Sequence, residues 1–302
     1  MLADSPILTT EGRNPASESI DRLSALEIVR LMNSEDAKAP QAVGREAESI
    51  AKAIEIIADR LRGGGRLIYL GAGTSGRLGV LDAAECPPTF STPPELVIGL
   101  IAGGREAMFR AAEGAEDCRD LAIADLDQVG LCSRDVLVGI ATSGRTPYVL
   151  AGLDHARQCG AYAIALSCSF QAAVNSVCDL AITPLVGPEV ISGSTRLKAG
   201  TATKMVLNML STGAMVLLGK TYGNLMVDLR ATNSKLVARS RRIVHEATGI
   251  SEAEAERLLA DCGGEVKTAI VMHVRRVSAD QSRQLLQRSG GQLRGALESD
   301  GG

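Results

Sequence analysis

The chain has 302 residues, of which 45% are hydrophobic, 22% are charged and 2% are aromatic, and its formal net charge is −3. This composition is typical of a globular protein, and the length allows two domains or one α/β domain with helical additions. A weakly acidic chain with few aromatic rings lacks a basic surface and base-stacking platforms, so we expect no nucleic acid as a partner and no membrane.

The cysteines and histidines carry no metal-binding or disulfide pattern. The seven cysteines include no C-x-x-C pair, and the three histidines are scattered along the chain. We therefore expect free thiols, no metal and a cytoplasmic protein, and the N-terminus shows no signal peptide. The apolar stretch 205–219 is interrupted by polar residues and is shorter than the roughly 20 residues that span a bilayer. We interpret it as a core or subunit-interface helix.

Residues 1–50 predict an N-terminal helical segment. Apolar residues recur at helical spacing through 20–31, and a second helix is expected from about 43 to 61, after Pro40. The glycines at 63–65 predict the end of that helix, just before a buried strand.

The central part of the chain, residues 51–235, alternates strands and helices. Five short apolar runs predict the strands, at 67–70, 96–102, 136–141, 162–167 and 179–183. Continuous apolar strands separated by helical segments predict an α/β domain whose mostly parallel sheet is covered on both faces. The sequence leaves the strand order open.

The first of these strands breaks into a glycine loop, which leads into a helix expected over 78–85. The loop contains Gly71, Gly73, Thr74, Ser75 and Gly76. Backbone N–H groups and the positive end of the helix dipole favour an anion at such a place.

Three interpretations of this loop remain open. The glycine spacing fits the dinucleotide fingerprint, but that needs an acidic residue at the end of the next strand, where this chain has Gly103 and Gly104. Neighbouring hydroxyl groups at Thr74 and Ser75 favour a terminal phosphate monoester, so a sugar phosphate is the preferred ligand. A purely structural turn is the third interpretation.

Two further loops rich in hydroxyl groups follow later strands. They contain Ser143, Gly144, Arg145 and Thr146 in one case, and Ser192, Ser194 and Thr195 in the other. Ligands of open parallel sheets bind beyond the carboxyl ends of the strands, so three such loops predict one phosphosugar site. Three cations follow the third loop: Arg196, Lys198 and Lys204. Each of them either neutralises the phosphate or is a solvated helix residue.

Residues 236–302 predict a small C-terminal helical domain. Ser251 precedes an acidic turn and is expected to cap a helix. Apolar residues that include Leu259, Ile270, Val274 and Leu286 predict two or three packed helices, which we interpret as a lid or an assembly piece.

Longer motifs resemble the N-acetylmuramic acid 6-phosphate etherases. They cover nearly the whole chain, at 70–79, 82–90, 99–104, 113–117, 143–148, 192–202 and 223–228. The resemblance implies a sugar isomerase (SIS) fold, a three-layer α/β sandwich, in a homodimer that uses no metal or organic cofactor. It also implies cleavage of the lactyl ether of the sugar with water, giving N-acetylglucosamine 6-phosphate and D-lactate during cell-wall recycling.

The same resemblance implies that Glu85 and Glu116 are the acid and the base. A C1 aldehyde, exposed by ring opening, acidifies the hydrogen on C2 and permits elimination of lactate from C3, which needs one base and one acid. Burial must then raise the pKa of one carboxyl. Our hypothesis takes Glu116 as base and Glu85 as proton donor. Without the resemblance, both glutamates would be interpreted as ordinary surface acids. The prolines at 87 and 88 also predict that the helix stops after Glu85.

The position of Glu85 raises a question of distance. An unbroken helix from Ser75 would place Glu85 about 15 Å from Ser75. This distance is longer than the distance between the phosphate of the sugar and its reacting carbons, C2 and C3. Either the helix bends or ends early, or Glu85 serves a neighbouring subunit, and we favour a site at or near a dimer interface. Two other functions stay open, a binding module similar to glucokinase regulatory proteins and an aldose–ketose phosphate isomerase. Glucokinase regulatory proteins have two sugar isomerase domains and about twice the length of this chain. The motif around Glu85 argues against both alternative functions.

Overall fold

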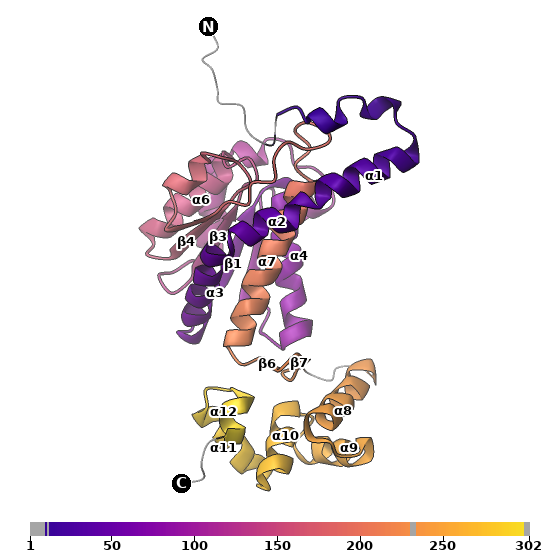
Figure 1. Ribbon diagram of the computed structural model, residues 1–302. Helices are drawn as coiled ribbons and strands as arrows, with labels where there is room; N and C mark the ends of the chain where they lie inside the picture. The colour runs from indigo at the N-terminus through magenta and orange to yellow at the C-terminus, as the bar shows by residue number, and fades with distance from the viewer. Residues whose placement is uncertain (1–9, 11, 230–233, 299–302) are drawn as a thin grey trace. The chain divides into compact units, whose positions relative to one another are not determined.

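The structure is a computed structural model that describes residues 10, 12–229 and 234–298 (Figure 1). The described residues form two compact units. The sheet unit contains those up to Ala84 together with residues 94–211, and the C-terminal unit contains residues 85–93 and those from Thr212 onward.

The N-terminal segment of the sheet unit is helical, as predicted, but its helices divide differently. After two 3-10 turns, η1 (Pro15–Ser17) and η2 (Ile20–Arg22), come α1 (Ala25–Asp36), α2 (Lys38–Arg45) and α3 (Ala47–Arg62). The expectation that the second helix starts after Pro40 is wrong, because α2 includes that proline. Pro40 is the third residue of α2, in the first turn, where a helix does not need the missing N–H group. Gly63 ends α3, as predicted.

The sheet has five parallel strands in the order β2-β1-β3-β4-β5. They are β1 (Leu67–Gly71), β2 (Val97–Ile101), β3 (Val136–Ile140), β4 (Tyr162–Leu166) and β5 (Leu180–Ile182), and all five predicted strands are confirmed. Because β1 and β3 are neighbours in register, Gly71 lies beside Ile140. The loops that follow these two strands therefore start side by side.

Helices cover both faces of the sheet. The helices that follow the strands are α4 (Gly73–Phe90), α5 (Arg119–Gln128), α6 (Pro147–Gln158) and α7 (Lys198–Leu217), and the 3-10 turns are η3 (Arg105–Met108), η4 (Ala115–Asp117) and η5 (Ala173–Ser176). A Cβ atom on Gly152 of α6 would lie 2.1 Å from Leu70, and one on Gly79 of α4 would lie 2.8 Å from Tyr69. Successive strand residues point to opposite faces, so α6 and α4 lie on opposite sides and the three-layer prediction is confirmed.

The helix after the glycine loop is longer than predicted at both ends. It starts at Gly73, so the loop supplies its first turn, and it runs past Pro87 and Pro88 to Phe90. The expectation that the prolines stop the helix at Glu85 is wrong. Each proline removes an N–H donor, but its carbonyl still accepts, and Ser91 donates its N–H to the Pro87 carbonyl at 3.0 Å.

The C-terminal unit contains a short hairpin and more helices than expected. The hairpin is β6 (Thr221–Tyr222) with β7 (Leu225–Met226), and residues 234–298 form α8 (Ser234–Thr248), α9 (Glu252–Asp261), α10 (Val266–Arg275), α11 (Ala279–Arg288) and α12 (Leu293–Glu298). Ser251 caps α9 as predicted, accepting the Glu254 N–H. Leu259, Ile270 and Leu286 are buried, whereas Val274 is 47% exposed and does not pack as expected.

The apolar stretch 205–219 lies mostly in α7, which buries Val206, Leu207 and Leu210 and exposes Met209 and Val216. One face of this helix is therefore core, as predicted. Within 10, 12–229 and 234–298, no helix combines the length and the hydropathy that crossing a bilayer requires.

Candidate functional site

The glycine loop forms the amino end of α4. Gly73 has φ +54°, and among the described atoms none lies within 4 Å of a Cβ built on it. A positive φ is easily adopted only by glycine, so this residue both turns the chain and leaves open space. Thr74, Ser75 and Gly76 complete the first turn. The N–H groups of Gly73, Thr74 and Ser75 have no acceptor inside the helix, whereas the Gly76 N–H donates to the Ala72 carbonyl at 3.3 Å. The arrangement suits an anion.

The loop after β3 reaches the first loop. The Ser75 and Thr142 hydroxyl groups lie 3.4 Å apart and are buried. Gly144 has φ +71°, and a Cβ there would lie 2.2 Å from the Ala172 Cβ, so only glycine fits this turn. The structure thus brings the first two predicted loops together, and it adds Thr142, which sequence reasoning did not choose as a site residue although it stands in the same motif.

The rest of that loop leads into α6. The Ser143 hydroxyl accepts the Arg145 N–H at 3.3 Å, and Thr146 is the residue before α6. Ser143 and Thr146 are half-buried, and Arg145 is exposed. Their side chains are accessible in part from the open edge of the sheet.

The third loop does not follow a strand directly, contrary to expectation. β5 ends at Ile182, whereas Ser192, Ser194 and Thr195 immediately precede α7. A Cβ on Gly200, in the first turn of α7, would lie 3.5 Å from the Thr195 carbonyl oxygen and 3.8 Å from Thr74 Cγ2. The third loop therefore approaches the first one through a helix rather than through a strand end.

Two of the three cations that follow this loop, Lys198 and Lys204, have carboxylate partners. The Lys198 side chain is 1% exposed, and its Nζ donates to Glu35 Oε2 at 2.6 Å. Lys204 lies 3.2 Å from Asp82. Arg196 is exposed. Lys198 as a phosphate ligand stays a prediction, since its ammonium group already has a buried partner.

Sequence reasoning missed the partner of Lys198. Glu35, on α1, accepts from Lys198, from Lys38 at 2.6 Å and from the Asn14 side chain at 2.9 Å. Asn14 also donates to the Pro188 carbonyl at 3.1 Å. Burial alone would raise the pKa of Glu35, but these hydrogen bonds outweigh it and hold the pKa at about 2. The N-terminal segment thereby holds the chain on both sides of the third loop.

A second buried acid, Glu189, was also missed. Its carboxylate accepts the backbone N–H groups of Lys198 at 3.2 Å and Ala199 at 2.9 Å, at the amino end of α7. Burial raises the pKa of Glu189, against the effect of those hydrogen bonds. Because this carboxylate occupies the end of α7, the amino end of α4 is the better place for a ligand anion. The sequence analysis singled out neither acid: Glu189 binds backbone groups nine and ten residues further on, and the buried cation of Glu35 is 163 residues away.

The two predicted catalytic acids lie in different units. Glu116 is in η4 of the sheet unit, directly after Gly114, which takes a left-handed conformation at φ +77°. Glu85 lies on α4, in the part assigned to the C-terminal unit. Both side chains are exposed.

Comparison with known proteins identifies the family. The N-terminal SIS domain of glucokinase regulatory protein matches residues 49–157, and the C-terminal lid domain of that protein matches residues 223–262. An N-acetylmuramic acid 6-phosphate etherase from Rhodopirellula baltica is 63% identical over 279 residues, which is 92% of this chain and 92% of that protein. The chain belongs to the N-acetylmuramic acid 6-phosphate etherase family.

Other similarities agree with this assignment to the etherase family. A protein of the same name from Escherichia coli is 55% identical over 97% of this chain and 98% of its own length. The solved structure of a phosphoheptose isomerase from Francisella tularensis superposes with a TM-score of 0.50 at 20% identity, covering 64% of this chain and 100% of that one. At that identity the likeness shows the fold alone, and it confirms the predicted SIS fold.

The cysteines and acidic residues do not form a metal site in the described part of the chain. All seven cysteines are free thiols, of which Cys86, Cys168 and Cys262 are buried. Within the described part of this etherase-family chain, no three His, Cys, Asp or Glu residues gather in a way that could hold a metal ion.

Proposed function

We propose that the protein cleaves the D-lactyl ether of N-acetylmuramic acid 6-phosphate with water, giving N-acetylglucosamine 6-phosphate and D-lactate. The reaction belongs to the recycling of peptidoglycan amino sugars, and we place it in the cytoplasm. Full-length relatives at 63% and 55% identity carry the name of this activity. In this chain, the main structural support for the proposal is that the Ser75 and Thr142 hydroxyl groups lie 3.4 Å apart at the amino end of α4.

The phosphate group is assigned to the first turn of α4. The N–H groups of Gly73, Thr74 and Ser75 provide donors there, and the open space beside Gly73 admits the ligand. Hydroxyl groups of Ser143 and Thr146 approach from the second loop, and those of Ser192, Ser194 and Thr195 from the third. A phosphate monoester has three terminal oxygens that each accept hydrogen bonds, so a ring of uncharged donors suits it.

The chemistry is assigned to the two glutamates. Glu116 removes the C2 proton of the open-chain sugar, the C3–O bond breaks, and Glu85 protonates the departing lactate oxygen. Water then adds across the C2–C3 double bond, which restores the saturated sugar and completes the hydrolysis. Residues 51–235 make up the phosphosugar-binding domain in this scheme, with residues 1–50 and 236–302 as helical additions.

A homodimer with shared sites is part of the proposal. α4 runs without a break from Gly73 to Phe90, so Glu85 lies about 15 Å along the helix from Ser75. Because α4 does not end early, we favour the explanation in which Glu85 serves a neighbouring subunit. The exposure of both glutamates supports it, since a second subunit can bury them.

Release of D-lactate from N-acetylmuramic acid 6-phosphate is the decisive test. The second candidate is a phosphosugar-binding regulator, which the matches to SIS and lid domains of glucokinase regulatory protein favour. The enzyme proposal expects enzymatic detection of stoichiometric D-lactate, and binding of the sugar without lactate release would establish the regulator instead.

Two further measurements separate the roles of the glutamates. In Glu85→Ala, lactate release should be abolished while exchange of the C2 hydrogen with deuterated water persists, because Glu116 is still present. Loss of exchange with intact lactate release would reverse the assignment. Mixed dimers of Glu85→Ala and Glu116→Ala chains should regain part of the activity if each site draws on both subunits, and no recovery would contradict sharing.

A further inference from the structure

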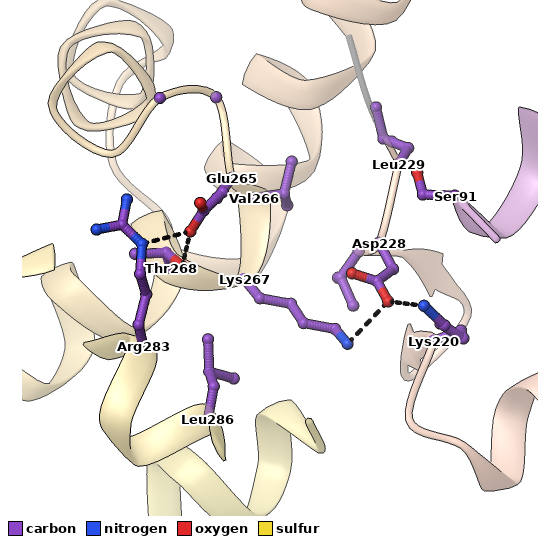
Figure 2. Close-up of a pocket in the computed structure, with 13 residues that line it drawn as sticks. Ser91, Lys220, Asp228, Leu229, Glu265, Val266, Lys267, Thr268, Arg283 and Leu286 are labelled. Carbon is purple, nitrogen blue, oxygen red and sulfur yellow. Dashed lines mark hydrogen bonds and ion pairs between the residues drawn. The ribbon is translucent and has the colours of Figure 1, made fainter. Parts of the chain in front are cut away.

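A polar cavity of about 770 Å³ lies within the C-terminal unit (Figure 2). Its wall includes Val227–Leu229, the stretch 263–268 that leads into α10, and Arg283 and Leu286 of α11. The volume is in the range of sites that hold small organic ligands. The motif 223–228, which the proposed mechanism does not use, ends in this cavity at Asp228.

The charges in the cavity do not balance. Asp228 lies 2.6 Å from Lys220 Nζ and 3.2 Å from Lys267 Nζ, so two ammonium groups share one carboxylate (Figure 2). Arg283 pairs with Glu265 at 3.0 Å and also with Asp280, outside the wall, at 2.9 Å. The local excess of one positive charge therefore lies at Lys220 and Lys267, which share Asp228.

Lys267 is the more buried of the two lysines that share Asp228. Its side chain is 11% exposed, and besides Asp228 it donates to the Gly291 carbonyl at 2.9 Å. Burial lowers the pKa of Lys267, and Asp228 opposes that effect. A buried ammonium that shares its carboxylate with a second one is costly, and an incoming anion reduces that cost.

The amino end of α10 adds further positive potential. Glu265 precedes the helix, but its carboxylate accepts from the Thr268 hydroxyl at 2.7 Å and from Arg283, and within the described residues no side chain caps the first turn. A helix end contributes roughly half a positive charge, which adds to the local excess of one charge at Lys220 and Lys267.

We propose that this cavity binds a small organic phosphate. A phosphate monoester carries about −1.5 to −2 charges at neutral pH, which matches the excess, and its oxygens suit the ammonium groups and the helix N–H donors. The volume exceeds what a bare anion fills, and Val227, Leu229, Val266 and Leu286 provide apolar wall for a carbon skeleton. The site is distinct in sequence from the loops of the proposed catalytic site, and it makes the C-terminal unit an effector-binding unit.

Hydrogen exchange of the full-length protein localises binding. The probes are N-acetylglucosamine 6-phosphate, glucose 6-phosphate, inorganic phosphate, D-lactate and unphosphorylated N-acetylglucosamine. At a phosphate ester concentration about ten times its Kd, exchange of amides in 263–268 should slow by roughly tenfold. An equal effect of inorganic phosphate would identify the free anion as the occupant. An effect of D-lactate or of the unphosphorylated sugar equal to that of the esters would overturn the proposal.

Variants separate this site from the catalytic one. Lys267→Met should abolish protection of 263–268 while protection of 71–76 by N-acetylglucosamine 6-phosphate persists, and Lys220→Met, at a half-exposed position, should do the same with less risk to folding. Arg288→Met removes the same charge from the exposed end of α11, outside the cavity, and should change nothing. Protection of 263–268 that survives both lysine variants, or that no phosphate produces in the unaltered protein, would overturn the proposal.

Discussion

The two units contain buried lysines in contrasting surroundings. In the sheet unit, Lys198 has Glu35 as a buried partner, and that carboxylate is held further by Asn14 and Lys38. In the C-terminal unit, Lys267 shares Asp228 with a second lysine at the wall of an open cavity. The sheet unit has thus neutralised its buried cation and presents uncharged hydroxyl and N–H donors, whereas the C-terminal unit keeps a positive excess.

This contrast shows what a buried lysine does in each place. A fully paired ammonium fixes the chain around it, because any displacement would leave a buried charge without a partner. Lys198 and Glu35 therefore hold the segment around the third loop against the N-terminal helices. A lysine that shares its partner keeps residual attraction for an anion, which is the property expected of a binding site.

The largest expected effect concerns the sheet unit's proposed base. Glu116→Gln should lower the rate of D-lactate release by about 10²- to 10⁴-fold, because a general base contributes on that order. Exchange of the C2 hydrogen with deuterated water should fall in parallel. Glu113→Gln is the matched control, since it removes an exposed acid three residues earlier, and it should leave both rates within about twofold. Equal losses in the two variants would assign the effect to the segment rather than to the base.

The strands and several helix ends could be predicted because local residues determine them. Five apolar runs gave the five strands, Gly63 ended α3, and Ser251 capped α9. The hydroxyl groups of Ser75 and Thr142 meet because parallel neighbouring strands end together, which the alternating pattern already favours.

Other features depend on contacts that no local pattern encodes. Lys198 and Glu35 are 163 residues apart in sequence, so burial of Lys198 could not be foreseen from its polar neighbours. The third loop was misplaced because nine residues, 183–191, separate the end of β5 at Ile182 from Ser192. Pro87 was read as a stop, although a helix can end one turn beyond a proline when the following N–H groups still find carbonyls.

A second prediction tests the neutralised lysine of the sheet unit. Lys198→Met should lower the free energy of unfolding by about 3 to 5 kcal/mol, because it removes the buried cation of the Glu35 carboxylate and leaves only the exposed Lys38 beside it. Lys38→Met removes the other lysine from the same carboxylate, but that side chain is 55% exposed, so the loss should stay below about 1 kcal/mol. Urea unfolding followed by circular dichroism measures both, and equal losses would contradict the distinction.

The same pair predicts how this difference depends on pH. The pKa of Glu35 is held at about 2, below its ordinary value of 4.5, so the stabilisation it provides is complete above that ordinary value and is lost as the pH falls toward 2. The loss caused by Lys198→Met should therefore shrink when urea unfolding is repeated at pH 3, because without Lys198 the pKa of Glu35 is lowered less and more of the carboxyl is protonated there. A constant difference between pH 7 and pH 3 would show that Glu35 does not supply it.

The smallest expected effect compares two glycines, one in each unit. Gly73 and Gly249 have φ of +54° and +76°, and among the described atoms none lies within 4 Å of a Cβ built on either. Alanine should cost each unit about 1 kcal/mol of conformational strain, with no steric clash inside the chain. Only at Gly73 would the new methyl group enter the space assigned to the phosphate. Steady-state kinetics should therefore show KM for N-acetylmuramic acid 6-phosphate rising about tenfold in Gly73→Ala, equivalent to about 1.4 kcal/mol of lost binding, and unchanged in Gly249→Ala. Because the backbone strain is matched, a KM that rises equally in both variants would mean that the open space beside Gly73 is not where the phosphate binds.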